Sequence, residues 1–296
     1  MTLIALALGL VLEHLATALL HLRELRWFDG YFDAAIRRIA RWPRWSFHAG
    51  LVLVIAVPAL PVLLISLGLR GDEIIWDVAY LSFAVLIVFF CLGPRDLGSE
   101  VDEYCEAKDG GDDEAADRVL LEMSEAERPR ASDIEIVEEA IFVQSNNRIF
   151  GVIFWFVVLG PVGAWIFRVS DLLRRRVVFE HQRAEAGNEP ILAAIESIYG
   201  ILKWVPARLA MLGYALSGSF DDAMNAWRGE LSVGHTPIDQ RNDLLIARVG
   251  KASMAGYLDE PANSSAAARN SMRIVRRTVF IWVCAIALMT LFGWAL

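Results

Sequence analysis

The stretch IFGVIFWFVVLGPVGAWIF, residues 149–167, decides the fold of this chain. It carries no charge, and its length is close to the roughly 20 residues that a helix needs to cross about 30 Å of hydrocarbon. Gly160, Pro161 and Gly163 break the run near its middle, because proline clashes with the preceding helical turn and glycine weakens a helix. Whether this run crosses a bilayer or turns back inside it determines on which side the following residues lie.

The composition of the whole chain indicates a membrane protein. Its 296 residues are 56% hydrophobic and their mean hydropathy is +0.42, which exceeds the values typical of soluble domains. Charged residues still make up 22%, so part of the chain lies in water. The net charge of −8 argues against a nucleic-acid partner. Cys91, Cys105 and Cys284 form neither a CxxC motif nor an even set, so we expect no disulfide scaffold, no metal site and no cofactor.

Four other apolar runs have the length of a membrane span. They cover residues 1–22, 49–69, 78–94 (extended back to 74) and 278–296. The first run lacks a basic start and a small-residue cleavage site, so we interpret it as a retained anchor and not as a signal peptide. It carries Glu13 at membrane depth, where an ionisable residue is a functional candidate, with a paired or protonated structural role as the alternative.

The distribution of arginine and lysine distinguishes the two topologies, since these residues favour the cytoplasmic side. If 149–167 turns back, segments 21–48 and 94–277 lie inside with 6 and 21 of the 28 basic residues, and Arg70 alone lies outside. If the run crosses once, 15 basic residues from Arg168 onward lie outside. We therefore predict an all-α polytopic membrane protein with about four spans, a re-entrant or interfacial helical hairpin and a cytoplasmic helical region. Five or six spans remain the alternative.

This topology divides the chain into five predicted segments. They are residues 1–93 with three transmembrane helices and a basic interfacial helix at 23–47, an acidic cytoplasmic segment at 94–147, re-entrant or interfacial helices at 148–217, cytoplasmic helices and a linker at 218–277, and a transmembrane helix at 278–296. The helix at 23–47 places apolar residues on one face and arginines elsewhere, which is typical of contact with membrane lipid.

Residues 94–147 concentrate the negative charge of the protein. They hold 17 Asp plus Glu against five Lys plus Arg, a local balance of −12. Two helices are predicted at 97–108 and 112–123, and their solvated acidic faces are suited to docking a protein partner. The run from Asp109 to Glu114 is not a calcium loop, because Glu114 occupies the position that requires glycine.

Polar side chains are carried to the membrane edge on both sides of the break at Gly160. A helix that begins at Ser132 or Asp133 leads into the apolar run, and a second helix follows it. Arg168 is expected to pair with Glu139 or Asp171, since a charge at membrane depth needs a partner. These residues form either structural salt bridges or a ligand site. The candidate ligand-binding residues are Glu13, Glu139, Asn146, Arg148, Arg168, Asp171, Arg174, His181, Trp204 and Arg208, and their mixed charge suits an anionic ligand.

Several blocks of the chain together resemble the AmpE family. They are FWFVVLGPVGA at 154–164, the pair Phe167–Arg168, KWVPARL at 203–209 and GSFDDAMNAW at 218–227. The resemblance implies a multi-pass protein of the bacterial inner membrane that is encoded with the cytoplasmic amidase AmpD and takes part in regulating β-lactamase induction and antibiotic resistance. It also implies a protein partner such as the AmpD amidase, or an anionic ligand that is cell-wall-derived or nucleotide-like.

AmpE proteins are in turn similar to CobD/CbiB, the membrane enzyme that joins cobyric acid to an amine. The shared features are the GPxGA turn at 160–164, Arg168 and the WxPARL block at 204–209. Where the ligase family has carboxylates suited to magnesium or a phosphorylated substrate, this chain has NNRIFG at 146–151 and SDLLR at 170–174.

We therefore expect a non-enzymatic signalling or sensory protein, without catalytic or metal-binding residues, that modulates β-lactamase induction in connection with cell-wall recycling. It would bind a ligand or a partner at the cytoplasmic membrane face. A membrane enzyme with residual ATP-dependent amide ligase activity is the alternative.

Overall fold

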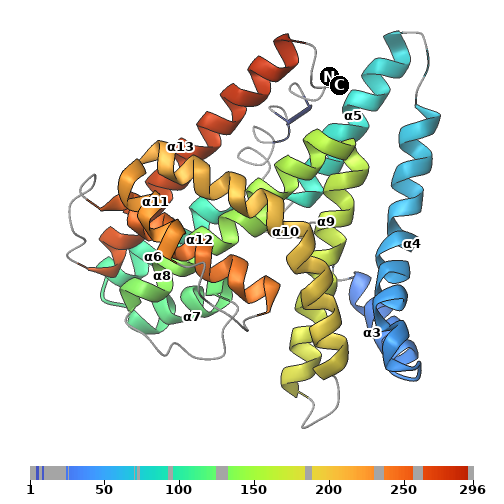
Figure 1. The fold of residues 1–296 in the computed structure, drawn as a ribbon, viewed down its shortest axis with the longest axis horizontal. Helices are drawn as coiled ribbons and strands as arrows, with labels where there is room; N and C mark the ends of the chain where they lie inside the picture. The colour runs from blue at the N-terminus through green and yellow to red at the C-terminus, as the bar shows by residue number, and fades with distance from the viewer. Residues whose placement is uncertain are drawn as a thin grey trace.

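A computed structural model shows a protein built from helices (Figure 1). It describes residues 5–6, 9, 25, 27–69, 71, 74–92, 96–124, 133–183, 189–229, 237–255 and 263–292. Within these ranges there is no β-strand, which confirms the predicted all-α class. Most of the predicted first span, including Glu13, lies outside the described residues.

The helices follow one another with short connections. They are α3 (Trp27–Ile39), the 3-10 turn η2 (Arg44–Ser46), α4 (Phe47–Gly68), α5 (Ile74–Cys91), α6 (Leu97–Asp109), α7 (Asp113–Ser124), α8 (Asp133–Ser145), the π-helical turn η3 (Asn146–Phe150), α9 (Gly151–Arg183), α10 (Glu189–Ser217), α11 (Phe220–Gly229), α12 (Ile238–Met254) and α13 (Ser264–Leu291). Helices α6 and α7 begin and end within one residue of the two predicted in the acidic segment.

Four helical stretches are long and apolar enough to cross a membrane. They are Arg44–Gly68, Ile74–Cys91, Ile134–Gln182 and Ser264–Leu291. Three of them overlap the spans predicted at 49–69, 78–94 and 278–296, and the third in chain order contains the run 149–167. Apolar side chains such as Leu53, Leu60 and Leu64 are exposed along α4, as expected of a surface that lipid covers. These stretches confirm the prediction of a helical membrane protein.

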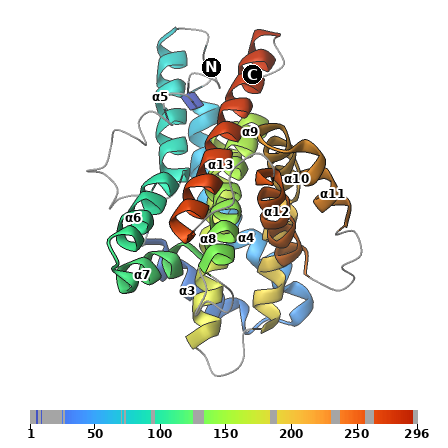
Figure 2. The same cartoon turned by 90° about the vertical axis from the view of Figure 1, so that its left-hand side faces the viewer.

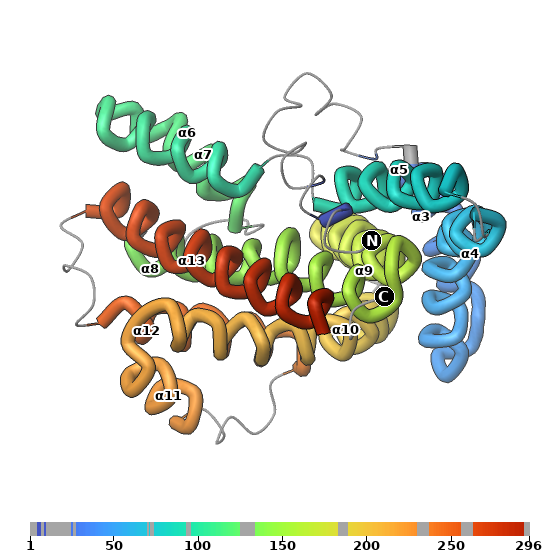
Figure 3. Tube along the Cα trace, turned by 90° about the horizontal axis from the view of Figure 1, so that it is seen from above, coloured from blue at the N-terminus to red at the C-terminus, as the bar shows by residue number. Residues whose placement is uncertain are grey.

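Two apolar cores lie side by side. The first is made by α3, α4, α5, most of α9 and the beginning of α10, and contains Leu51 and Val152. The second is made by α6, α7, α8, the end of α10, α11, α12 and α13, and contains Leu120 and Ile246. Figure 3 shows the two groups of helices next to each other, and Figure 2 shows α6 and α7 packed beside α8 and α13. The chain passes from one core to the other between α5 and α6, along α8–α9 and along α10.

The apolar run 149–167 folds back on itself at Gly160. This residue has φ 65° and ψ −154°, a conformation that essentially only glycine adopts, and it separates α9 into two arms. A Cβ on Gly151 would collide with the ring of Phe167, and a Cβ on Gly163 would collide with the carbonyl oxygen of Trp155. Contacts between 151 and 167 and between 155 and 163 show that the arms are antiparallel. The predicted helical hairpin is confirmed.

Four prolines lie inside the described helices, and two of them, Pro58 and Pro206, each leave a carbonyl that a neighbouring helix satisfies. Proline has no N–H, so the carbonyl four residues before it loses its helical donor. The Tyr31 hydroxyl donates to the carbonyl of Val54, four residues before Pro58, at 2.9 Å. The Trp155 indole donates to the carbonyl of Leu202, four residues before Pro206, at 3.0 Å.

Helix α10 is consequently continuous from Glu189 to Ser217, although Pro206 lies inside it. The proline removes one hydrogen bond within the helix, and a hydrogen bond between helices replaces it.

We predict that Gly160→Ala destabilises the protein by about 1–3 kcal/mol, the typical cost of a side chain in this backbone conformation. The measurement is the midpoint of thermal unfolding of the purified protein in a neutral detergent. The control is Gly30→Ala in α3, where a Cβ would meet no atom within 4 Å and the helix would gain a better helix former. Equal midpoints for the two variants would contradict a turn that requires glycine.

Candidate functional site

Charged side chains are buried or partly buried where the two cores meet. Six of them and the amide of Gln144 form what we call the buried charge network, because hydrogen bonds or ion pairs connect each to another: Glu100, Gln144, Arg148, Arg168, Asp171, Arg174 and Arg175. Arg148 lies on the polar turn η3, between α8 and α9. Phe142, before this turn, belongs to the second core, and Val152, after it, belongs to the first core. The network thus links segments of both cores.

Arg148 connects the network to the acidic helix α6. Its Nη1 donates to Glu100 Oε2 at 2.7 Å, and its Nε donates to Gln144 Oε1 at 3.1 Å. Arg148 is 3% exposed and Glu100 is 7% exposed, so water contributes little to their solvation. Arg148 lies on the π-helical turn η3, an irregularity that is frequent at functional sites.

Asp171 is the centre of the network on the second arm of α9. Its carboxylate accepts hydrogen bonds from Arg168 at 3.0 Å, from Arg174 at 3.2 Å and from Arg175 at 2.9 Å. Arg175 also donates to Gln144 Oε1 at 3.4 Å, which joins this half of the network to the Arg148 half. Of the two predicted partners of Arg168, the structure shows Asp171.

The network contains more positive than negative charge. Four arginines and two carboxylates leave an excess of two positive charges within the set defined above. Buried charge of one sign is costly unless a counter-charge compensates it. The arrangement therefore suits an interaction with an anion.

A second group of charged side chains is connected to the network through Tyr199. The Arg174 guanidinium lies 5.0 Å and the Lys203 ammonium 5.2 Å from the centroid of the Tyr199 ring, so both make cation–π contacts with it. Lys203 is fully buried and pairs with Asp239 and with Asp243, whose two oxygens lie 2.7 and 2.8 Å from its Nζ. We call Lys203, Asp239 and Asp243 the Lys203 cluster; it connects α10 with α12.

Burial raises the pKa of Asp243 from 3.8 to about 6. Lys203 opposes this shift, and the neighbouring Asp239 adds to it. With two carboxylates facing a single ammonium, the cluster retains an extra proton to a higher pH than an exposed aspartate would.

The structure brings together four of the predicted site residues, Arg148, Arg168, Asp171 and Arg174, in the buried charge network. Asn146 is fully buried on the adjoining turn η3, and its side-chain nitrogen and oxygen have no hydrogen-bond partner in the part of the chain that the structure describes. Its side-chain amide therefore has unused hydrogen-bonding capacity, as do Asn147 Oδ1 and Arg168 Nε nearby.

The other predicted residues lie apart from the network. Glu139 is exposed on α8. His181, near the end of α9, is close enough to Glu196 of α10 for their charges to interact. The Arg208 guanidinium stacks 4.7 Å from the Trp204 ring centroid and donates to Asn242.

Sequence reasoning missed Glu100, Arg175 and the Lys203 cluster as site residues. Lys203 is fully buried and paired. The available signal was the pair Asp239 and Asp243, which are four residues apart and therefore on one face of a helix. Glu100 gave no comparable signal among the 17 acidic residues of its segment.

Comparisons with known proteins agree over the whole chain. The family model described as regulatory signalling modulator protein AmpE matches residues 1–296. Protein AmpE of Shigella flexneri is 26% identical to this chain over 307 aligned residues, which cover 99% of each protein. No solved structure matches the chain.

Two proteins named cobalamin biosynthesis protein CobD are similar to part of the chain. The protein of Stutzerimonas stutzeri is 26% identical over 65% of this chain and 61% of its own length. The protein of Chromobacterium violaceum is 25% identical over 55% of this chain and 53% of its own length.

We predict that part of the stability of the protein is lost as the pH rises from about 4 to about 6. An unfolded aspartate has a pKa near ~3.9, so in this window the folded state binds more protons than the unfolded state. The contribution of Asp243 is complete below about pH 4 and disappears above about pH 6, with a size on the order of 2 kcal/mol. The measurement is the midpoint of thermal unfolding in neutral detergent as a function of pH. In Asp243→Asn this midpoint should change less between about pH 4 and about pH 6 than in the unsubstituted protein.

The matched control for this measurement is Asp221→Asn, which changes an exposed aspartate on α11. It should leave the profile of the unsubstituted protein unchanged. A profile of Asp243→Asn that is as steep as that of the control would show that Asp243 does not retain the extra proton.

Proposed function

The chain belongs to the AmpE family of regulatory signalling modulator proteins, and we propose that it transmits its signal through the buried charge network. In this proposal the protein lies in the bacterial inner membrane, with the acidic helices α6 and α7 in the cytoplasm. It modulates β-lactamase induction in connection with cell-wall recycling.

The observation that carries the proposal is the connection from Glu100 on α6 to Asp171 on the returning arm of α9. The two ends belong to different cores, and the second core includes α6 and α7, which expose acidic side chains. Buried ion pairs tolerate little change in geometry, so a displacement of α6 must be accommodated by Arg148 and then by the hairpin. A pair of alternative arrangements of these ion pairs would give the two states that signalling requires.

Helix α6 supports this proposal because its two faces differ. Its outer face exposes Asp102, Glu103 and Glu106, and α7 adds exposed acidic residues such as Glu114. Its inner face places Glu100 in the network. A partner with a basic surface that docks on the outer face, such as an AmpD-like amidase, would therefore act on the same helix that holds Arg148.

The excess positive charge of the network supports an anionic ligand as the second input. The guanidinium groups of Arg148 and Arg168 could bind carboxylate or phosphate oxygens of a cell-wall-derived or nucleotide-like molecule. The unused amide of Asn146 lies on the same turn as Arg148 and could contribute a donor and an acceptor.

We predict that exchanging the charges of one buried pair disrupts signalling and that exchanging both restores it. Glu100→Arg and Arg148→Glu each place like charges against each other, whereas the double variant restores opposite charges at 2.7 Å. The measurement is β-lactamase induction in a deletion strain complemented with each variant, normalised to the amount of protein in the membrane. Each single variant should fall to the level of the deletion strain.

The control is the exposed pair Lys108 and Asp113, which lie 2.8 Å apart on α6 and α7. Lys108→Asp should leave induction unchanged, since an exposed ion pair contributes only about 0–1 kcal/mol. Single variants of the buried pair that accumulate normally and induce normally would refute transmission through the network.

The similarity to the CobD proteins supports testing a second candidate function, a residual ATP-dependent amide ligase activity. We predict no nucleotide turnover when the purified protein is incubated with magnesium, ATP and a panel of amines and carboxylic acids. Reproducible release of phosphate or pyrophosphate that depends on both an amine and an acid would favour the enzyme over the signalling protein.

A further inference from the structure

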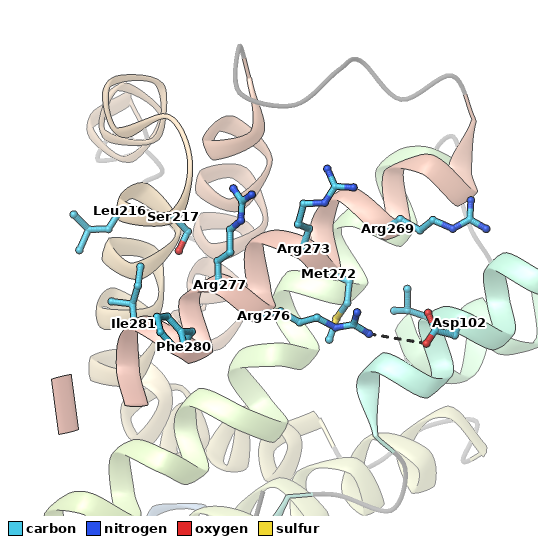
Figure 4. A pocket seen from close by; sticks show the side chains of 11 residues that line it. Asp102, Leu216, Ser217, Arg269, Met272, Arg273, Arg276, Arg277, Phe280 and Ile281 are labelled. Carbon is cyan, nitrogen blue, oxygen red and sulfur yellow. Dashed lines mark ion pairs between the residues drawn. The ribbon is translucent and has the colours of Figure 1, made fainter. Parts of the chain in front are cut away.

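A groove of about 730 Å³ runs along the first half of α13, away from the buried charge network (Figure 4). Its walls are completed by Val101 and Asp102 of α6 and by Leu216 and Ser217 at the end of α10. The lining includes no residue of the buried charge network or of the Lys203 cluster. The groove is therefore a separate site.

One wall of the groove is strongly basic. Arg269, Arg273, Arg276 and Arg277 follow one another at helical spacing, and Figure 4 shows them along one helix above the groove. The acidic residue in the lining is Asp102, so the lining has an excess of three positive charges.

Two of the arginines, Arg273 and Arg276, are weakly neutralised by the described part of the protein. Arg276 lies 3.9 Å from Asp102, and both side chains are more than 60% exposed, so this ion pair contributes little. Arg269 pairs with Asp109 at the far end of the groove. Arg273 is exposed and has no ion pair within the described ranges. The groove therefore offers positive charge to an external anion.

The opposite end of the groove is apolar and exposed. Leu216 is 58% exposed and Phe280 is 69% exposed, and Ile281 lies beside them in Figure 4. Residues 278–291 of α13 are uncharged and belong to the candidate membrane span Ser264–Leu291. The arginines thus stand at the point where the polar part of α13 gives way to its apolar part, as basic residues do at the boundary between headgroups and hydrocarbon.

We propose that this groove binds an anionic phospholipid of the surrounding membrane. The phosphate of the headgroup contacts Arg273, Arg276 and Arg277, and an acyl chain lies against Leu216 and Phe280. A soluble anion would use the basic wall alone and would leave the adjoining exposed apolar side chains uncovered. A lipid uses both ends at once, and it is present wherever the span is. This inference uses none of the residues on which the proposed signalling function rests.

The test is lipid binding to the purified protein in a neutral detergent, read by native mass spectrometry during titration with phosphatidylglycerol or phosphatidylcholine. We expect the protein to bind phosphatidylglycerol at least tenfold more tightly than phosphatidylcholine. The triple variant Arg273→Gln, Arg276→Gln, Arg277→Gln should lose this preference, since each basic residue at a membrane surface contributes about fivefold.

The matched control removes three arginines elsewhere, by Arg228→Gln, Arg241→Gln and Arg248→Gln on α11 and α12. It lowers the net charge equally and should keep the preference for phosphatidylglycerol. Equal loss in both triple variants would show a general effect of charge and would overturn the proposed site. If the groove variant does not fold, weaker phosphatidylglycerol binding to the unsubstituted protein at high salt supports the proposal, and salt-independent binding overturns it.

A competition experiment distinguishes a lipid from a free phosphate. Glycerol 3-phosphate, which carries the phosphate without acyl chains, should fail to displace phosphatidylglycerol at a hundredfold excess. Phe280→Ser should weaken phosphatidylglycerol binding through loss of the apolar end. Displacement by glycerol 3-phosphate at concentrations similar to that of the lipid would identify the groove as a site for a soluble phosphate compound and would overturn the lipid assignment.

Discussion

The carboxylate of Asp171 is the interaction on which the interior depends. It is fully buried, and it accepts hydrogen bonds from three guanidinium groups, those of Arg168, Arg174 and Arg175. Through Arg175 and Gln144 it also fixes Arg148, and Arg148 in turn fixes α6 through Glu100. Apolar packing alone would permit the hairpin and the acidic helices to shift relative to each other. The requirement that every buried charge keep a partner removes that freedom.

This arrangement explains how one chain can be both a lipid-facing protein and a regulatory one. The first core is formed by helices that expose apolar side chains, and the second is partly formed by helices that expose acidic ones. Charged groups that are costly to bury lie at the junction of the cores, where they couple the two environments. The π-helical turn η3, which carries Arg148, lies at this junction. The hairpin follows it, and Gly160 forms the turn of the hairpin.

Local features could be predicted from the sequence, and contacts between distant segments could not. The turn at Gly160 followed from three residues close together, and the acidic helices α6 and α7 followed from a local pattern. The position of Lys203 depends on two aspartates about 40 residues later, so its burial could not be deduced from α10 alone. Arg168 and Asp171 were predicted as a pair because they are three residues apart, whereas the partner of Arg148 lies 48 residues away.

The hydrogen bond from Trp155 to the carbonyl of Leu202 has an evolutionary consequence. The carbonyl of Leu202 can accept this hydrogen bond because residue 206 is a proline and supplies no N–H to it. Trp155 therefore has its acceptor only while Pro206 is present, although the two residues lie on different helices. An alanine at 206 would supply an amide to that carbonyl from within its own helix and leave the indole without an acceptor in an apolar setting. The two positions should therefore be exchanged together when family members diverge, and their joint presence should mark relatives that keep the same angle between these helices.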